Sequence, residues 1–369
     1  MTKMRIIVSG GGTGGHIYPA MALIKRLKER DMIEDVLYVG TEKGLESKIV
    51  KRAGLNFKTI EIQGFKRRLS LDNVKTVQLF ISSISKSKKI IKEFKPDVVV
   101  GTGGYVSSAV VYAAHSMHIP TVIHEQNTIA GVTNKFLAHF VDKIAIAFTE
   151  AADQFSEKKK IVFAGNPRAQ EVVNIKANDR LTEFKLAADK PTVMIFGGSR
   201  GATPINKATI GALAKFEQTD YQVLFVTGRV HYDNAIKDID PKYLNSANIS
   251  VVPYIDNMPE ILPDLNLIVG RSGATSIAEI TALGIPAIFV PSPYVTHDHQ
   301  TKNALSVSKN GAAVVIKETD LTPDSLFDEV NKIMADDTLQ KDMSAKSKKI
   351  GVPDAADRLI KVLTNLVNK

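Results

Sequence analysis

A histidine stands directly behind a glycine-rich stretch near the start of the sequence. Residues 10–15 contain five glycines, and His16 follows them. Because glycine loses the most conformational freedom on folding, such a stretch indicates a loop whose backbone a ligand approaches closely. An imidazole at its end can take up a proton near neutral pH. The pattern therefore predicts a binding loop with a proton acceptor beside it, and its Gly-x-Gly-x-x-Gly spacing also fits a dinucleotide-binding loop.

Three more glycine-containing loops follow strand-like runs further along the chain. They lie at 101–104 (GTGG), 197–201 (GGSRG) and 271–274 (RSGA), each in front of a helical stretch. Helix N-termini with bare glycine backbone offer free N–H groups and the positive end of the helix dipole to an anion. We therefore expect a diphosphate at these loops. The P-loop lysine is missing, which argues against ATP hydrolysis.

A carboxylate lies one to two turns inside the helix that begins at the fourth loop. There Glu279 would flank a ligand seated on the helix N-terminus and accept both hydroxyls of a ribose, while the N-terminal amides bind the phosphates. The polar residues 297–300 (HDHQ) follow the next strand and are placed to reach a sugar. These features favour a nucleotide diphosphate as the ligand of this half of the chain.

The rest of the sequence supplies the elements that hold these loops. Strand-like apolar runs alternate with amphipathic helical stretches, and a polar stretch at about 165–190 interrupts the rhythm. Continuous apolar strands in a βαβ rhythm predict parallel sheets covered on both faces. A chain of 369 residues suits two such domains. We therefore expect an α/β fold with two doubly wound, Rossmann-like domains facing a cleft, and the glycine loops at the carboxyl ends of the strands.

Composition limits the functional classes. The 44% hydrophobic and 24% charged residues are typical of a soluble globular protein, and the lack of cysteine excludes disulfides and thiolate metal sites. No apolar run approaches the roughly 20 residues of a membrane span. The N-terminal apolar run is also too short for a signal peptide, so we expect a cytosolic chain.

The net charge of +9 is concentrated between residues 58 and 95, which hold ten Lys or Arg and three Asp or Glu. Segment 64–71 (GFKRRLSL) mixes apolar residues with Lys66, Arg67 and Arg68, which suits contact with an anionic membrane surface. In the amphipathic helix that follows, through about residue 94, we expect the apolar positions to face the core and the lysines to be solvated. These positions are Val77, Ile81, Ile84 and Ile91.

Seven motifs, in this order and spacing, resemble those of the MurG family of N-acetylglucosaminyltransferases. They are GGGTGGHIYPA, GTGGYVSS, HEQNTIAGVTNK, GNPR, GGSRGA, RSGATSIAE and HDHQTKNA, and they span essentially the whole chain. The resemblance implies a GT-B fold and an inverting transfer of GlcNAc from UDP-GlcNAc to the 4-hydroxyl of MurNAc in undecaprenyl-linked lipid I. The product is lipid II for peptidoglycan synthesis. It also implies no cofactor, no metal and no nucleic acid, a peripheral place on the cytoplasmic face of the cell membrane, and partners in a cell-wall synthesis complex.

The resemblance assigns roles to the two halves of the chain. It implies an N-terminal domain at 1–165 that faces the acceptor and the membrane, and a UDP-GlcNAc-binding domain at 166–351. The C-terminal helix, within 352–369, is expected to pack back on the first domain.

The family's donor contacts carry over to this chain position by position. They fall on Thr13, Gly14, Gly15, Asn127, Arg168, Ser199, Ile255, Ala274, Thr275, Ser276, Ile277, Ala278, Glu279 and Gln300. Two positions depart from the family pattern. Many members have two glutamines where this chain has His299-Gln300, so only Gln300 carries over. Some members place a residue between GNP and the arginine, whereas Arg168 follows GNP directly.

For the reaction itself, single displacement needs a base that takes the proton of the attacking hydroxyl, and charge stabilisation on the departing UDP. His16 is the candidate base, Glu125 of HEQN is the competing one, and Tyr105 is a candidate acceptor contact. Two metal-like patterns have other interpretations. We expect 238–240 (DID) to be a solvated turn, and 297–299 (HDH) to be a loop that contacts substrate.

Three other functions remain open on the residues alone. A nucleotide-sugar epimerase of the same architecture would bind the donor without a lipid acceptor. An NAD(P)-dependent oxidoreductase would use the first glycine loop, with Glu42 on the ribose. A nucleic-acid-binding protein would explain the basic charge. The glycine loop at 197–201 and Glu279 oppose the last two, because neither needs a second diphosphate site.

Overall fold

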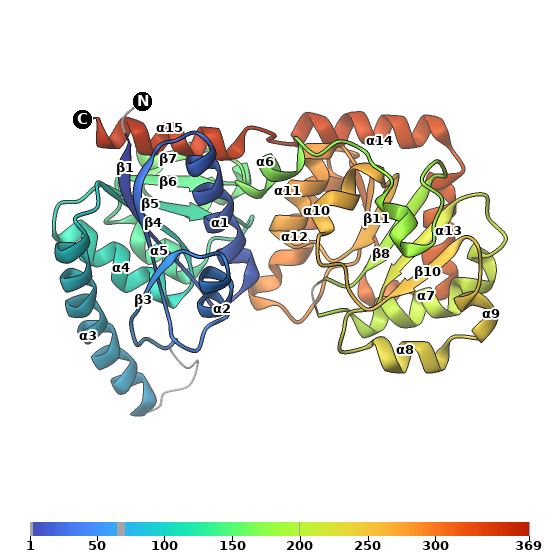
Figure 1. The fold of residues 1–369 in the computed structure, drawn as a ribbon, viewed down its shortest axis with the longest axis horizontal. Coiled ribbons are helices and arrows are strands. Elements are labelled where there is room, and N and C mark those ends of the chain that lie inside the picture. The colour runs from blue at the N-terminus through green and yellow to red at the C-terminus, as the bar shows by residue number, and fades with distance from the viewer. Residues whose placement is uncertain (1–2, 65–70, 199, 369) are drawn as a thin grey trace. The chain divides into compact units, whose positions relative to one another are not determined.

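The chain folds into two compact units, drawn in Figure 1. The structure, a computed structural model, describes residues 3–64, 71–198 and 200–368. One unit comprises Met1–Arg168 together with Asp354–Lys369, and the other comprises Ala169–Pro353. The boundary expected between residues 165 and 166 lies close to this division.

Unit 1 is built on a seven-stranded sheet in which every neighbouring pair of strands is parallel. Its order is β3-β2-β1-β4-β5-β6-β7. The strands are β1 (Met4–Gly10), β2 (Ile33–Gly40), β3 (Asn56–Thr59), β4 (Val98–Gly103), β5 (Thr121–Glu125), β6 (Lys143–Ile146) and β7 (Ile161–Phe163). The helices are α1 (Gly14–Glu29), α2 (Leu45–Arg52), α3 (Leu71–Phe94), α4 (Tyr105–Ser116), α5 (Val132–Ala138), α6 (Arg168–Val172), which straddles the division, and α15 (Ala355–Val367).

Alternating residues of the strands enter two separate hydrophobic cores, one on each face of the sheet. On β1, Ile7 packs with residues of α3, α4 and α5, whereas Ile6 and Val8 pack with residues of α1 and α15. Successive side chains of a strand point to opposite faces, so a strand buried on both faces needs a continuous apolar run. This explains why the strands of this unit lack a polar alternation.

The C-terminal helix α15 completes unit 1 although it follows unit 2 in the sequence (Figure 1). Leu359, Ile360 and Leu363 of α15 are buried in the core beside α1. Asp357 accepts hydrogen bonds from Arg26 Nε at 3.0 Å and Nη2 at 2.8 Å, and from Arg30 Nη1 at 2.9 Å. The helix is therefore held by apolar packing and by ion pairs at one end.

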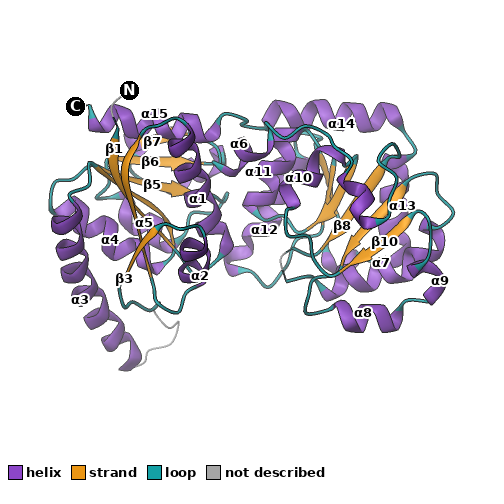
Figure 2. Cartoon of the chain, viewed as in Figure 1, coloured by secondary structure: helices purple, strands orange, loops and turns teal. Residues whose placement is uncertain are grey.

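Unit 2 repeats the same architecture with a six-stranded parallel sheet, coloured orange in Figure 2. Its order is β10-β9-β8-β11-β12-β13. The strands are β8 (Thr192–Phe196), β9 (Gln222–Val226), β10 (Ile249–Val252), β11 (Leu267–Gly270), β12 (Ala287–Phe289) and β13 (Ala313–Val315). The helices are α7 (Thr203–Phe216), α8 (Tyr232–Asp238), α9 (Pro241–Leu244), α10 (Met258–Ile261), α11 (Ala274–Leu283), α12 (His299–Ser308), α13 (Pro323–Met334) and α14 (Asp337–Ile350).

Both sheets have the strand order of the doubly wound fold, in which ligands bind outside the carboxyl ends of the strands where the order reverses. The order reverses between β1 and β4 in unit 1, and between β8 and β11 in unit 2. The four glycine loops follow these four strands. The two expected α/β domains are therefore confirmed, and each unit carries one pair of glycine loops at its reversal point.

Helix α3 is oriented differently from the expectation. Ile84 and Ile91 pack against the core, but Val77 and Ile81 do not, because they are 44% and 62% exposed. Small polar side chains take part of the buried face of α3 instead; they are Thr76, Ser83 and Ser87. The Ser83 hydroxyl, for example, donates to the backbone carbonyl of Glu61 at 2.6 Å. The expectation was wrong because it assigned the buried face from apolar residues alone.

In the described ranges, no helix has both the length and the apolar character to cross a bilayer.

Candidate functional site

The two glycine loops of unit 1 pack against each other backbone to backbone. The amide of Gly11 donates to the carbonyl of Gly103 at 3.2 Å. Gly104 has φ +81°, and a Cβ atom on it would lie 2.4 Å from the carbonyl oxygen of Gly11. A side chain would therefore force the loops apart, which explains part of the glycine content.

His16 lies in the first turn of α1 and is held between these loops. Its Nδ1 is 2.9 Å from the carbonyl oxygen of Gly11, and its ring fills the space beside Gly103. Because a carbonyl oxygen only accepts hydrogen bonds, Nδ1 of the neutral ring must carry the proton. Nε2 is then the basic nitrogen. This tautomer is the one that a general base at Nε2 requires.

Hydrogen bonds continue from His16 to the loops that follow β4, β5 and β7. The Thr102 hydroxyl donates to the His16 carbonyl at 2.7 Å, and Gln126 Nε2 donates to the Thr102 carbonyl at 2.9 Å. Gln126 Nε2 also lies 2.9 Å from His124 Nδ1, while His124 Nε2 donates to the carbonyl of Gly165 at 2.8 Å. Burial lowers the pKa of His124, so this ring is neutral. The network ties four loops of one sheet edge together.

Glu125, the competing base, has both carboxylate oxygens engaged in the loop that follows it. Oε1 accepts from the Asn127 amide at 3.0 Å. Oε2 accepts from the Gly131 amide at 2.9 Å and from Asn134 Nδ2 at 2.8 Å. The side chain is 2% exposed. This geometry favours Glu125 as the residue that shapes the loop of Asn127 and leaves His16 as the better-placed base.

The remaining candidates of unit 1 lie around the same edge. Thr13 is the N-cap residue of α1, and Gly14 and Gly15 form its first turn. Tyr105 begins α4, is 52% exposed and lies against Gly64. The guanidinium carbon of Arg168 lies 5.5 Å from the ring centroid of Tyr18 on α1. Arg168, which was placed in the second domain, therefore belongs structurally to the first.

A buried acid at this edge escaped the sequence analysis. The acid singled out there, Glu42, is 68% exposed at its side chain and pairs with Lys51 at 3.7 Å. Glu46, four residues later, is 1% exposed and accepts a hydrogen bond from the Gly12 amide at 3.1 Å. The glycines at 40 and 44 around it were the available signal.

In unit 2, helix α11 presents its N-terminus without a side-chain cap. Its N-cap residue is Gly273, so the first amides keep their hydrogen-bonding capacity for a ligand. The Thr275 hydroxyl in the first turn is shielded from solvent and has no hydrogen-bond partner within the part of the chain that the structure describes. Glu279, on the next turn, is 7% exposed. Ser276, Ile277 and Ala278 lie between them on the same helix.

The loop that carries Gln300 is tied to this N-terminus. The Ser272 hydroxyl donates to the Gln300 carbonyl at 2.8 Å, and Asn303 Nδ2 donates to the Ser272 carbonyl at 3.2 Å. Gln300 Oε1 accepts from the Ser292 amide at 2.9 Å. The side-chain oxygen of Gln300 thus anchors the loop.

Ile255 lies in a loop that is tied down on both sides. It is 5% exposed. Arg229 contacts the residues on both sides of Ile255. Its guanidinium carbon lies 4.5 Å from the ring centroid of Tyr254, and its Nη2 pairs with Asp256 Oδ1 at 2.8 Å. Asn257 donates to Glu260 of α10.

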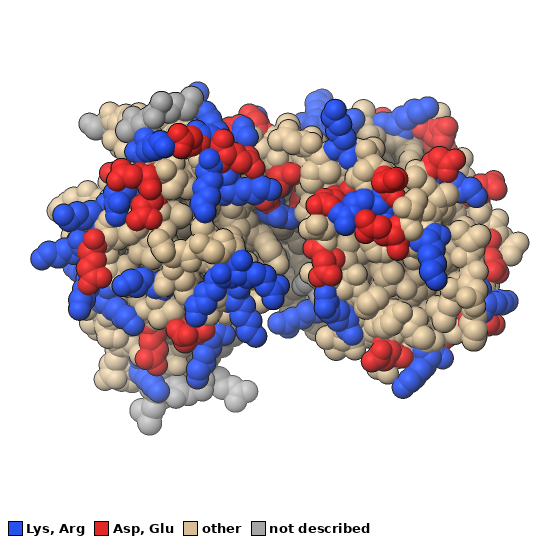
Figure 3. Space-filling view, in the orientation of Figure 1, with Lys and Arg blue, Asp and Glu red and all other residues tan. Residues whose placement is uncertain are grey.

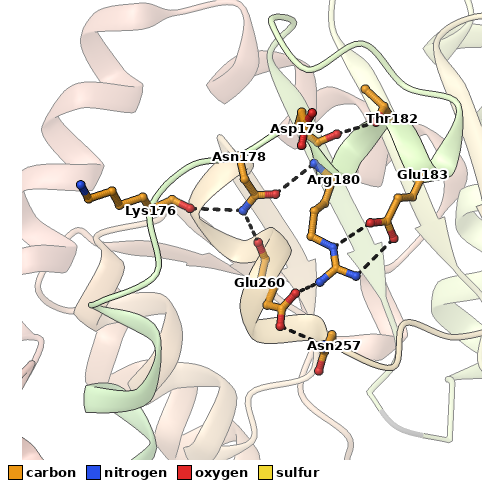
Figure 4. A network of polar contacts seen from close by, with 8 residues as sticks. All are labelled: Lys176, Asn178, Asp179, Arg180, Thr182, Glu183, Asn257 and Glu260. Atoms are coloured by element: carbon orange, nitrogen blue, oxygen red, sulfur yellow. Dashed lines mark hydrogen bonds and ion pairs between the residues drawn. The ribbon is translucent and has the colours of Figure 1, made fainter.

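Figure 4 shows how Glu260 is held from the other side. Arg180 pairs with it, and Asn178 Nδ2 donates to its carbonyl at 2.7 Å. Residues just after the boundary between the units therefore fix the helix behind the Ile255 loop.

Other sequence candidates lie apart from these groups. Ser199 falls outside the described residues, as do residues 65–70 of the basic segment. Asp240 caps α9 by accepting from the Lys242 amide at 3.0 Å, and Asp238 ends α8. His299 Nδ1 donates to the Thr296 carbonyl at 2.8 Å. Over the described ranges, no three His, Asp or Glu side chains are grouped as metal ligands would be.

Two family models match the two halves of the chain. The glycosyltransferase family 28 N-terminal domain matches residues 6–146, and the C-terminal domain of the same family matches residues 192–359. The chain is 59% identical to the UDP-N-acetylglucosamine--N-acetylmuramyl-(pentapeptide) pyrophosphoryl-undecaprenol N-acetylglucosamine transferase of Latilactobacillus sakei, over 98% of this chain and 100% of the relative. The enzyme of the same name from Lactiplantibacillus plantarum is 58% identical, over 99% and 100% of the two chains.

Solved structures agree with these matches. MurG of Acinetobacter baumannii superposes with a TM-score of 0.76 at 27% identity and covers 98% of this chain and 99% of its own. A UDP-N-acetylglucosamine 2-epimerase superposes with a TM-score of 0.70, over 100% and 98% of the two chains, but at 15% identity it shows the fold alone. The family that the motifs indicated is thereby confirmed. The chain belongs to glycosyltransferase family 28 and, within it, to the MurG family.

Proposed function

We propose that this chain transfers GlcNAc from UDP-GlcNAc to the 4-hydroxyl of MurNAc in undecaprenyl-linked lipid I, giving lipid II. The observation that carries the proposal is full-length identity of 59% to a transferase of that name. The pairs of glycine loops at both reversal points support it, because the reaction has a diphosphate on the donor and another on the acceptor. The epimerase alternative has only the shared fold behind it.

Most donor contacts are assigned to unit 2, whereas Thr13, Gly14, Gly15, Asn127 and Arg168 lie in unit 1. The uncapped amides of α11 and the Thr275 hydroxyl would receive the diphosphate, where the helix dipole favours negative charge. Glu279 would accept the ribose hydroxyls, Ile255 would contact the uracil, and Gln300 would donate to the sugar. Helix α7 also starts without a side-chain cap, so its N-terminus adds a second set of amides.

The acceptor is assigned to the loops of unit 1. His16 Nε2 takes the proton from the attacking hydroxyl, whose oxygen forms the new bond to C1 of GlcNAc. The bond from C1 to the UDP oxygen breaks, and its electron pair leaves with UDP, whose charge the α11 amides stabilise. One displacement inverts the configuration at C1. Tyr105, exposed at the start of α4, would contact the acceptor.

Donor choice is tested by calorimetry with UDP-GlcNAc, UDP-glucose and NADH in parallel. We expect UDP-GlcNAc to bind, UDP-glucose to bind more weakly and NADH to give no signal. The reason is that the residues proposed in unit 2 would contact a uridine diphosphate and its sugar. Binding of NADH without binding of UDP-GlcNAc would overturn the proposal.

We also propose that unit 1 docks on the anionic cytoplasmic surface of the membrane that holds the lipid acceptor. The supporting feature is an exposed apolar stripe on α3, formed by Val74 (57% exposed), Val77 and Ile81. Phe136 of α5, 39% exposed and 6.1 Å from Phe80 of α3, widens it. Basic residues of 64–71 precede the helix in sequence. Apolar residues rimmed by cations suit an interfacial site.

A further inference from the structure

Glu46, a buried acid of unit 1, accepts hydrogen bonds from the first glycine loop and from the loop that follows β2. It is the second residue of α2 and 1% exposed. Oε2 accepts from the Gly12 amide at 3.1 Å, and Oε1 accepts from the Thr41 amide at 3.0 Å and the Thr41 hydroxyl at 2.7 Å. A carboxylate buried in this way is stable only when such bonds replace those to water.

Three glycines from separate segments make room for this carboxylate. A Cβ atom on Gly11 or Gly44 would lie 2.6 Å or 2.2 Å from Glu46 Oε1, and one on Gly40 would lie 2.7 Å from its Cγ. None of the three has the positive φ that by itself calls for glycine. Their common feature is therefore the space they leave for Glu46. In the first glycine loop, Gly11 thus makes room for the buried carboxylate of this residue.

The hydrogen bond to Gly12 fixes the residues that orient His16. Gly12 lies between Gly11, whose carbonyl accepts from His16 Nδ1, and Thr13, the N-cap of α1. The Tyr38 hydroxyl holds Gly10, the residue before Gly11, by donating to its carbonyl at 2.8 Å. Burial, with a smaller contribution from the charge of Glu46, raises the pKa of Tyr38, so the phenol keeps its proton and remains a donor.

We propose that Glu46 is a positioning residue, which acts through the backbone of the first glycine loop to hold His16 with Nε2 as its basic nitrogen. The hydrogen bonds of Glu46 go to Gly12 and Thr41, so it acts on His16 through the loop backbone. The proposal rests on the proposed function, because it takes His16 as the base. It adds a residue to the reaction that the motif comparison did not mark.

The first test measures the loop without any reaction. Glu46→Gln keeps the size of the side chain but replaces one accepting oxygen by an NH2 group, which faces an N–H donor at Gly12 or Thr41. Amide hydrogen exchange in the peptide covering residues 11–16 is expected to accelerate about ten-fold or more. The matched control is Glu42→Gln, which changes an exposed acid on the same segment and should leave that exchange unchanged. Unchanged exchange in Glu46→Gln would overturn the proposal.

The second test measures catalysis. Glu46→Gln is expected to lower kcat about ten-fold. In a His16→Ala background the same change should cost less than about two-fold, because both changes then remove one shared interaction. An equal loss in both backgrounds would mean that Glu46 only supports the fold, and would overturn the proposal.

A second variant guards against a misfolded Glu46→Gln. Gly44→Ala keeps the glutamate at position 46 but puts a methyl group into the space that its carboxylate occupies. It should reproduce the loss of kcat and have little further effect when combined with Glu46→Gln. Retention of wild-type kcat in Gly44→Ala would count against the proposal. Failure of the proposed function gives a different result, because the wild type would then transfer no GlcNAc. The exchange test would still decide whether Glu46 holds the loop.

Discussion

At the scale of single residues, Glu279 offers the sharpest test of the donor site. It is 7% exposed on α11, and we propose that it accepts two ribose hydroxyls. Glu279→Gln keeps the shape but removes the charge, and a hydrogen bond to a charged group contributes roughly 1.5–3 kcal/mol. The affinity for UDP-GlcNAc, measured by calorimetry, should therefore fall about ten-fold or more. Acceptor affinity should stay close to the wild-type value.

A 2′-deoxy donor supplies the control for this substitution, because it removes one partner from the ligand side. The wild type should bind the deoxy donor more weakly than UDP-GlcNAc, and Glu279→Gln should show a smaller difference between the two donors. Strictly additive losses would show that Glu279 does not touch the ribose.

Residue types and spacing were sufficient to propose His16 and Glu279 as candidates, because each stands at a fixed distance from a glycine loop. They were not sufficient for Glu46. Two acids follow β2, and only the start of α2 at Leu45 turns the second toward Gly12. The sequence also does not reveal which tautomer an imidazole adopts, because the tautomer depends on the carbonyl that its Nδ1 contacts.

At the scale of elements, the exposed stripe of α3 is expected to contact membrane lipid. Replacing Val77 and Ile81 together by serine removes apolar surface that would be buried in lipid. Burial of such surface contributes about 25 cal/mol per Å² to the free energy of binding. Binding to vesicles of anionic phospholipid, measured by sedimentation, should weaken about ten-fold. The affinity for UDP-GlcNAc should not change, because these residues belong to the other unit.

The matched control is Leu305→Ser, which removes an exposed leucine (51% exposed) from helix α12 of unit 2. It should leave vesicle binding at the wild-type level. Equal binding by the double variant and the wild type would place the membrane contact elsewhere on the chain.

Strands were easier to predict than the faces of helices. A strand of a parallel sheet is apolar on both sides, so runs such as 98–100 (VVV) identify it directly. The buried face of α3 instead depends on Ser83 finding the carbonyl of Glu61, a contact 22 residues away in sequence. Periodicity of apolar residues does not carry that information.

At the scale of the whole molecule, one topology occurs twice with different loops attached. The repeated glycine loops made two doubly wound domains predictable. The apolar periodicity of α15 alone did not determine where it docks, because docking depends on Asp357 meeting Arg26, 331 residues earlier in the chain; the expectation that it packs on the first domain accompanied the family resemblance. On the face drawn in Figure 3, Lys and Arg are interspersed with Asp and Glu, so the net charge of +9 does not form one continuous basic field there.

The central claim, GlcNAc transfer with His16 Nε2 as the base, is tested most directly by the transfer reaction itself. The measurement is single-turnover transfer from UDP-GlcNAc to a lipid I analogue by the wild type and by His16→Ala, with the anomeric configuration of the product determined. The wild type should give the inverted, β-linked disaccharide. His16→Ala should lower the rate about 100-fold or more, because general-base catalysis contributes that much, and should bind UDP-GlcNAc as the wild type does. An undiminished rate in His16→Ala, or an α-linked product, would contradict the account.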